Sequence, residues 1–81
     1  MASLTRVWFG TGRRSVCRVE VNGLWRGTIR TTGIEDTLRP GIAGHLVYQA
    51  VTYDGVWLDP VASDYVQAER ALLNATKELD D

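Results

Sequence analysis

The chain of 81 residues has little of the residue types that build cross-linked, metal-bound or membrane-bound proteins. Its one cysteine, Cys17, excludes an internal disulfide and indicates a reducing compartment. Its one histidine, His45, leaves too few sulfur and imidazole ligands for a zinc site. No apolar run approaches the ~18 residues that span a bilayer, and the N-terminus lacks the apolar segment of a signal peptide. We therefore expect a cytoplasmic protein with no metal, no cofactor and no membrane partner.

Lysine is also scarce: the sequence has one lysine and eight arginines. The charges are segregated along the chain. Through Pro40, seven arginines against three acids give a formal charge of +4, and from Gly41 onward two cations against seven acids give −5. The total of −1 thus hides a basic half and an acidic half. Such asymmetry favours fast, salt-sensitive association with a charged partner.

The length predicts one domain, residues 1–81, with a single core. No internal repeat, low-complexity tract or linker divides the sequence. A hydrophobic content of 44% and a charged content of 23% are typical of a soluble globular domain, so we expect a folded protein rather than a disordered chain.

Short β-prone and alternating segments predict an antiparallel sheet. The expected strands are Leu4–Phe9, Ser15–Val21, Leu24–Thr32 and His45–Tyr53, with a short further strand at Val56–Leu58. The stretch Gly33–Gly44 predicts a long connection between the third and fourth of these.

The hairpin around Asn22 and Gly23 has two alternative registers. A two-residue turn pairs Val21 with Leu24 and mixes polar with apolar side chains on both faces. A three-residue loop with a bulge separates the polar side chains from the apolar ones. It gathers an apolar set on one face: Cys17, Val19, Trp25, Gly27 and Ile29. We predict the three-residue loop.

The C-terminal segment predicts an amphipathic helix. Its apolar stripe is Val61, Tyr65, Ala68, Leu72, Ala75 and Leu79. Asp59 and Pro60 predict its start, with Ser63 or Asp64 as later alternatives. The expected fold is therefore α+β: an antiparallel β-meander of four to five strands with one C-terminal α-helix packed on one face.

No arrangement of residues predicts a catalytic site, so we do not expect an enzyme or a small-molecule substrate. Cys17 belongs to an apolar strand face, and His45 begins another strand. The turn Gly10–Ser15 has glycines and arginines that suit a phosphate cradle. A strand follows it, however, where a nucleotide-binding loop leads into a helix, so we favour a hairpin turn.

Five arginines form the candidate partner-binding cluster: Arg13, Arg14, Arg18, Arg26 and Arg30. In the predicted register Arg18 lies opposite Arg26, and a like-charge pair of this kind destabilises a sheet. A repulsion that the sheet tolerates indicates that the positive face is used. The alternative is a solvated strand face with ordinary arginines.

Three tryptophans are many for so small a domain. Tryptophan serves both as bulk in a core and as an anchor in binding surfaces. We assign Trp25 to the core and expect partial exposure of Trp8 and Trp57.

These features predict a small non-enzymatic binding protein that docks on a larger protein or ribonucleoprotein partner. In size and character it is similar to phage-encoded inhibitors such as anti-CRISPR proteins, which are also small, cysteine-poor α+β proteins. The alternative is a nucleic-acid-binding domain that uses the basic sheet face. In its expected architecture the chain is similar to the three-strand-plus-helix DNA-binding domains of the AP2 type and of integrase arm-binding regions. Val56–Leu58, followed by an alanine-rich helix through Ala75, resembles the final strand and helix of the AP2 type.

Overall fold

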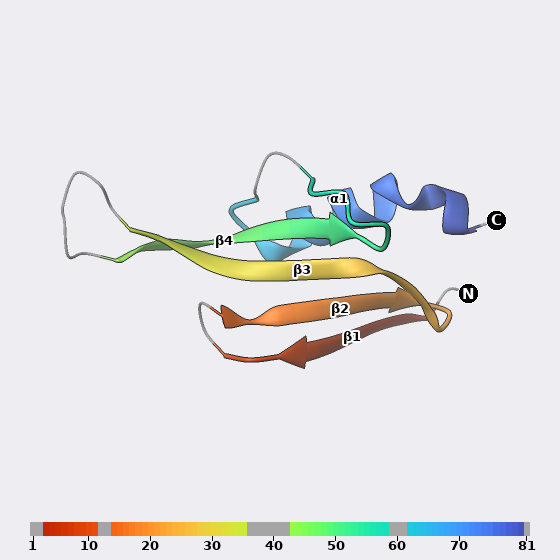
Figure 1. Ribbon diagram of the computed structural model, residues 1–81, viewed down its shortest axis with the longest axis horizontal. Helices are drawn as coiled ribbons and strands as arrows, with labels where there is room; N and C mark the ends of the chain where they lie inside the picture. The colour runs from red at the N-terminus through yellow and green to blue at the C-terminus, as the bar shows by residue number, and fades with distance from the viewer. Residues whose placement is uncertain (1–2, 12–13, 36–42, 59–61, 81) are drawn as a thin grey trace.

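The computed structural model describes residues 3–11, 14–35, 43–58 and 62–80, which form one antiparallel sheet with a helix on one face (Figure 1). The strands are β1 (Leu4–Phe9), β2 (Val16–Val21), β3 (Leu24–Glu35) and β4 (Ala43–Thr52). They lie in the sheet in sequence order, so the sheet is a meander. Helix α1 (Tyr65–Ala75) follows, with a short 3₁₀ helix, η2 (Lys77–Asp80). The predicted α+β class and topology are confirmed.

The two ends of the sheet differ from one another. Strand β1 joins the sheet as an edge, pairing with β2 from Leu4 opposite Val21 to Phe9 opposite Val16. The predicted strand Val56–Leu58 forms an isolated bridge instead, with Trp57 opposite Val51 of β4. Strands β3 and β4 extend into the predicted connection Gly33–Gly44, and the middle of that connection, residues 36–42, lies outside the described residues.

The turn between β2 and β3 is the two-residue one, so the predicted three-residue loop was wrong. Asn22 and Gly23 both have positive φ, 55° and 79°, as a type I′ turn requires. The turn pairs Val21 with Leu24 and Glu20 with Trp25. A bulge then shifts the register, and Val19 pairs with Gly27. One extra residue in β3 therefore restores the apolar face that the tight turn alone would have scrambled.

The extra residue is Arg26, and the glycine after it allows the helix to approach. Gly27 has a φ of 154°. A side-chain carbon there would lie 2.3 Å from the carbonyl oxygen of Val51 and 2.8 Å from Leu72 Cδ1. The close contact between β3, β4 and α1 thus requires glycine at this position.

Helix α1 begins at the later of the predicted starts. Asp64 is its N-cap, and the side chain of Asp64 accepts a hydrogen bond of 3.0 Å from the backbone N–H of Gln67. Asp59 and Pro60 lie outside the described residues. The predicted apolar stripe is confirmed at Ala68 and Leu72, which are buried. It was wrong at Ala75, which is exposed.

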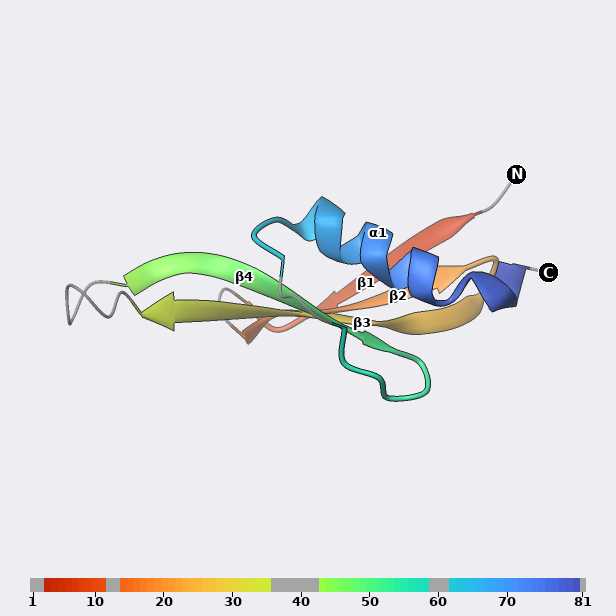
Figure 2. The same ribbon diagram turned by 90° about the horizontal axis from the view of Figure 1, so that it is seen from above.

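The core lies between the helix and the sheet. Its buried members are Cys17, Val19, Ile29, Ala50, Ala68 and Leu72. Figure 2 shows α1 on one side of the sheet and the turn after β4 on the other side. We call the side without the helix the open face.

Candidate docking surface

The bulge in β3 removes Arg26 from the predicted arginine cluster. Arg26 is 2% exposed and lies beneath the helix. Its Nε donates a hydrogen bond of 2.8 Å to Thr76 Oγ1, and its Nη2 donates one of 3.3 Å to the carbonyl oxygen of Leu73. A cation at the C-terminal end of a helix is stabilised by the helix dipole and by the last carbonyl groups. Arg26 is therefore a structural residue, and its assignment to a partner-binding surface was wrong.

The predicted like-charge pair is absent as well. Arg18 lies opposite Thr28 in the ladder, because the bulge moves Arg26 out of register. The guanidinium of Arg18 instead lies 4.9 Å from the ring centroid of Trp25, with Nη2 3.9 Å from a carboxylate oxygen of Glu20. The sheet thus relieves the expected repulsion rather than tolerating it.

The open face carries two arginine–tryptophan pairs. The first is Arg18 with Trp25, and the second is Arg30, whose guanidinium lies 5.3 Å from the ring centroid of Trp57. Trp25 is 37% exposed and Trp57 is 54% exposed. The predicted core position of Trp25 was therefore wrong, and the partial exposure expected of Trp57 is confirmed. Each guanidinium is held over a ring by cation–π attraction, so both arginines are oriented rather than freely mobile.

Strand β1 extends this face with apolar side chains. Because paired residues share a face of a sheet, Val7 lies beside Arg18 and Phe9 beside Val16. Phe9 is 53% exposed and Val7 is 39% exposed. Together, by pairing and alternation, the open face comprises Thr5, Val7, Phe9, Val16, Arg18, Glu20, Trp25, Thr28, Arg30, Val47, Gln49 and Val51, with Trp57 over Arg30.

A cavity of about 510 Å³ lies at the Arg30 end of the open face. Its lining is Arg14, Ser15, Val16, Arg30, Thr31, Gln49 and Trp57. The amide of Gln49 donates a hydrogen bond to the carbonyl oxygen of Leu58, which fixes one wall. Two guanidinium groups beside an indole ring suit a negatively charged group with an apolar neighbour.

One arginine of the predicted cluster, Arg14, lies in the turn between β1 and β2. Arg14 is exposed and lines the cavity, and its backbone N–H donates to the carbonyl oxygen of Thr11 at 3.1 Å. Arg13 lies outside the described residues. The segment Gly10–Ser15 joins two antiparallel strands, so its interpretation as a hairpin turn is confirmed. Of the five predicted arginines, the structure thus brings Arg14 and Arg30 together at the cavity and places Arg18 further along the same face.

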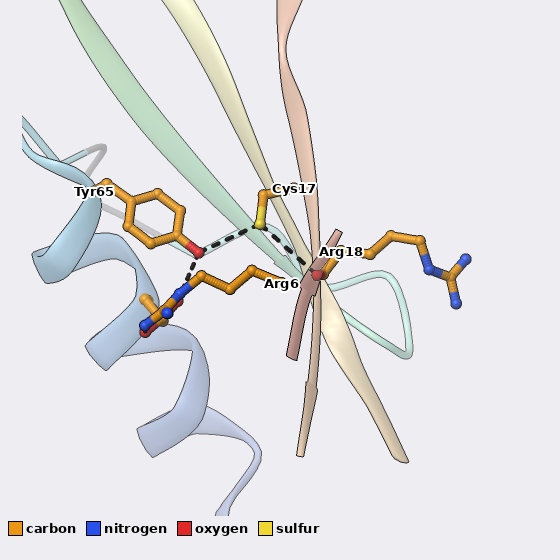
Figure 3. Close-up of polar contacts among 5 residues, drawn as sticks. Arg6, Cys17, Arg18 and Tyr65 are labelled. Atoms are coloured by element: carbon orange, nitrogen blue, oxygen red, sulfur yellow. Dashed lines mark hydrogen bonds and ion pairs between the residues drawn. The ribbon is translucent and has the colours of Figure 1, made fainter. Parts of the chain in front are cut away.

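The helix side holds a network of hydrogen-bonded side chains, the polar network, that sequence analysis missed (Figure 3). Arg6 of β1 binds both carboxylate oxygens of Glu69 on α1, at 2.6 and 2.7 Å. The hydroxyl of Tyr65 donates to Glu69 Oε2 at 2.6 Å and lies 3.4 Å from the sulfur of Cys17. Figure 3 also shows that the side chain of Arg18 points away from this polar network, while the backbone carbonyl oxygen of Arg18 accepts a hydrogen bond from the thiol of Cys17. These contacts join the edge strand to the helix.

The protonation states of the side chains in the polar network follow from burial and hydrogen bonding. Arg6 donates to Glu69 and lowers the pKa of that carboxyl group, so Glu69 is ionised. Burial raises the pKa of Tyr65 and of Cys17, so both stay protonated at neutral pH. The hydroxyl proton of Tyr65 goes to Glu69, and the thiol of Cys17 donates to the backbone carbonyl oxygen of Arg18 at 3.7 Å. A protonated, fully buried thiol is a poor nucleophile.

The remaining tryptophan, Trp8, lies on this side of the sheet. Its ring centroid is 5.3 Å from that of Tyr65, and it is 49% exposed, as expected. The three tryptophans therefore report on two surfaces: Trp25 and Trp57 on the open face, and Trp8 on the helix side.

Comparisons with protein-family models, with curated proteins and with solved structures found no match to this chain. Within the described residues, no three histidine, cysteine, aspartate or glutamate side chains gather closely enough to hold a metal ion. The side chain of His45 lies outside the part of the chain that the structure describes. The longest described helix, α1, falls short of what a membrane crossing needs.

Proposed function

We propose that this protein is a non-enzymatic binding protein that docks on a larger protein partner through its open face. The observation that carries the proposal is the pair of exposed tryptophans, Trp25 and Trp57, each with an arginine held over its ring. Tryptophan and arginine dominate the energetic centres of protein–protein interfaces. Held side chains also lose less conformational entropy on binding, which raises the affinity that a given contact delivers.

The chemistry of the open face selects an acidic partner surface. Arg14, Arg18 and Arg30 are positive, and Glu20 offsets part of the charge of Arg18. An aspartate or glutamate side chain of the partner fits the cavity between Arg14 and Arg30, with its apolar stem against Trp57. The acidic C-terminal half of the chain lies mainly in the helix segment, and its repulsion from an acidic partner favours docking by the opposite side.

This proposal includes the kind of partner expected from the sequence. A cytoplasmic protein or ribonucleoprotein complex with an acidic protein surface fits this description, and docking on such a surface is compatible with the role of a phage-encoded inhibitor of the anti-CRISPR kind. Arg26 is no longer part of the proposed interface, because it is buried.

The test compares charge reversal on the two sides of the molecule. The tagged wild-type protein is used to capture its partner from a lysate of the cells in which it functions, and the affinity for the purified partner is measured by calorimetry. The double variant Arg18→Glu/Arg30→Glu should lose at least ~100-fold in affinity, because each residue belongs to one of the two arginine–tryptophan pairs that carry the proposal. The double variant Arg70→Glu/Lys77→Glu makes the same charge change at two exposed positions of the helix segment and should bind as wild type.

An unchanged affinity in Arg18→Glu/Arg30→Glu, with the fold retained, overturns the proposal. Equal losses in both double variants also contradict it, because they would reflect net charge rather than the open face.

A second function, binding of single-stranded nucleic acid, is favoured by the exposed rings of Trp25 and Trp57 beside arginines and by the exposed ring of Phe9 on the same face. Bases stack on such rings, and guanidinium groups bind phosphates. We rank it second because each tryptophan already carries a guanidinium over its ring and the sequence pI is about 5.7. A fluorescence titration with mixed-sequence DNA and RNA at about 50 mM salt decides the matter, since phosphate contacts give strong binding at low salt. Saturable quenching would favour nucleic acid, and a flat titration would leave the protein partner.

A further inference from the structure

One edge strand of the sheet, β4, is covered by other backbone segments, and within the described residues the other edge strand, β1, is not. The outer edge of β4 is covered, because Tyr48 exchanges backbone hydrogen bonds of 2.8 and 2.9 Å with Ala62, and the N–H of Leu58 donates to the carbonyl oxygen of Ala50 at 2.9 Å. Strand β1 stands at the other end of the sheet, and all six of its residues are exposed. No segment of the described chain lies along its outer side (Figure 1).

The backbone direction along β1 follows from one hydrogen bond. The N–H of Asn22 donates to the carbonyl oxygen of Ser3 at 2.8 Å. Because hydrogen-bonded and non-hydrogen-bonded pairs alternate in an antiparallel ladder, Thr5 and Val7 use their backbone groups toward β2. Leu4, Arg6 and Trp8 therefore direct their N–H and C=O groups outward, which is a template for a further strand.

We propose that two copies of this protein pair through β1, antiparallel about a two-fold axis at Val7, so that their sheets join into one. A two-fold axis requires a self-complementary surface, because each residue meets the residue related to it by symmetry. The outward-directed backbone groups allow only registers in which Leu4, Arg6 and Trp8 pair among themselves or with Gly10.

The side chains of β1 select the axis at Val7 among these registers. It places the two Val7 side chains together and sets Arg6 of each copy opposite Trp8 of the other. The side chain of Arg6 stays 44% exposed while it binds Glu69 of its own copy, so its guanidinium group can also meet the half-exposed ring of Trp8 by cation–π attraction. An axis at Arg6 sets two arginines face to face, and like charges directly opposite destabilise a sheet. Axes further toward either end pair fewer residues of the strand.

The expected affinity is modest. A six-residue strand gives a small interface, although it buries apolar side chains that are 38% exposed at Leu4, 49% at Trp8 and 53% at Phe9. Interfaces of this size belong to the weak class, so we expect a Kd of about 1 to about 100 μM. The pairing would double the open face, because both copies present that face on the same side of the joined sheet.

A disulfide tests both the pairing and its register. In the proposed dimer Val7 forms a non-hydrogen-bonded pair with itself, with Cα atoms about 4.5 Å apart, which is within the range that a disulfide bridges. Val7→Cys should therefore cross-link efficiently under mild oxidation. The control Thr5→Cys should not, because the two copies of residue 5 lie four residues out of register, about 14 Å apart. Cys17 is buried, so the wild-type protein should stay uncross-linked.

The oligomeric state supplies an independent measurement. Analytical ultracentrifugation of the wild-type protein between about 1 and about 200 μM should show a species of twice the chain mass of 9.0 kDa, growing with concentration. Val7→Lys should be monomeric throughout, because it sets two positive charges together at the axis. Val56→Lys adds the same charge at a 52% exposed turn position and should dimerise as wild type.

Several results overturn the proposal. The proposal is wrong if the wild-type protein stays monomeric over the whole concentration range, even if β1 then accepts a strand of a different protein. A dimer that persists in Val7→Lys, or faster cross-linking of Thr5→Cys than of Val7→Cys, also refutes the pairing described here. None of these results bears on docking through the open face, which is tested with Arg18 and Arg30.

Discussion

Arg26 is buried in the structure, whereas the sequence predicts it on an exposed arginine face. The loss of stability on substituting Arg26 distinguishes these two positions. Arg26→Ala removes a charged donor from Thr76 and from the Leu73 carbonyl group, and it removes the side-chain stem beneath the helix. Hydrogen bonds that involve a charged group contribute about 1.5–3 kcal/mol each and are not fully additive. We therefore expect a loss of about 3 kcal/mol in the free energy of unfolding.

That loss is large for so small a protein. A domain of this length is stable by roughly 4–12 kcal/mol. Urea unfolding followed by tryptophan fluorescence measures it, and with a slope near 1 kcal/mol/M the midpoint should fall by about 3 M urea. Arg26→Lys keeps the charge and the stem but lacks the fork that reaches both acceptors, so its loss should be intermediate.

The matched control is Arg18→Ala, which removes a half-exposed arginine from the neighbouring strand. It loses one cation–π contact and one long ion pair and should cost about 1 kcal/mol or less. If Arg26→Ala costs no more than Arg18→Ala, Arg26 does not lie beneath the helix, and the bulged register is wrong.

Three further predictions concern the helix side. Gly27→Ala should destabilise by more than about 1 kcal/mol in the same urea assay, because its Cβ would overlap the Val51 carbonyl oxygen; an unchanged midpoint would contradict this packing. Glu69 has a lowered pKa when folded, so its pairing with Arg6 stabilises above the unfolded pKa and this contribution is lost as pH falls through the folded value. Glu69→Gln should accordingly be less stable than wild type at pH 7, and the difference should shrink below about pH 4; a constant difference would refute the ion pair. Finally, Cys17 should resist a thiol reagent in the folded protein and react fully in urea, whereas equal rates would show that it is accessible.

The sequence predicted the strands and the helix because their hydrophobic periodicity is strong. It failed at the hairpin, where Asn22 and Gly23 are the standard residues of a two-residue turn. The hydrophobic pattern favours the longer loop, because a tight turn in a regular ladder mixes polar and apolar side chains on the two faces. The structure satisfies both demands by inserting Arg26 as a bulge. A glycine within a strand pattern often marks a bulge, so Gly27 was a signal that could have located it.

The candidate surface was predictable only in part. Arg18 and Arg30 face the open side because they alternate with buried residues, and this much follows from the sequence. The position of Trp57 over Arg30 depends on the path of the chain after β4, which no local pattern fixes. The ion pair of Arg6 with Glu69 joins residues 63 positions apart, and a single sequence offers no means of pairing them.

The indole N–H signals of the three tryptophans, observed by NMR while the captured partner is added, test the central claim most directly. Trp25 and Trp57 lie on the open face, and Trp8 lies on the helix side. We predict that the signals of Trp25 and Trp57 shift or broaden while that of Trp8 stays in place. A shift at Trp8 with the other two signals unchanged would contradict docking through the open face.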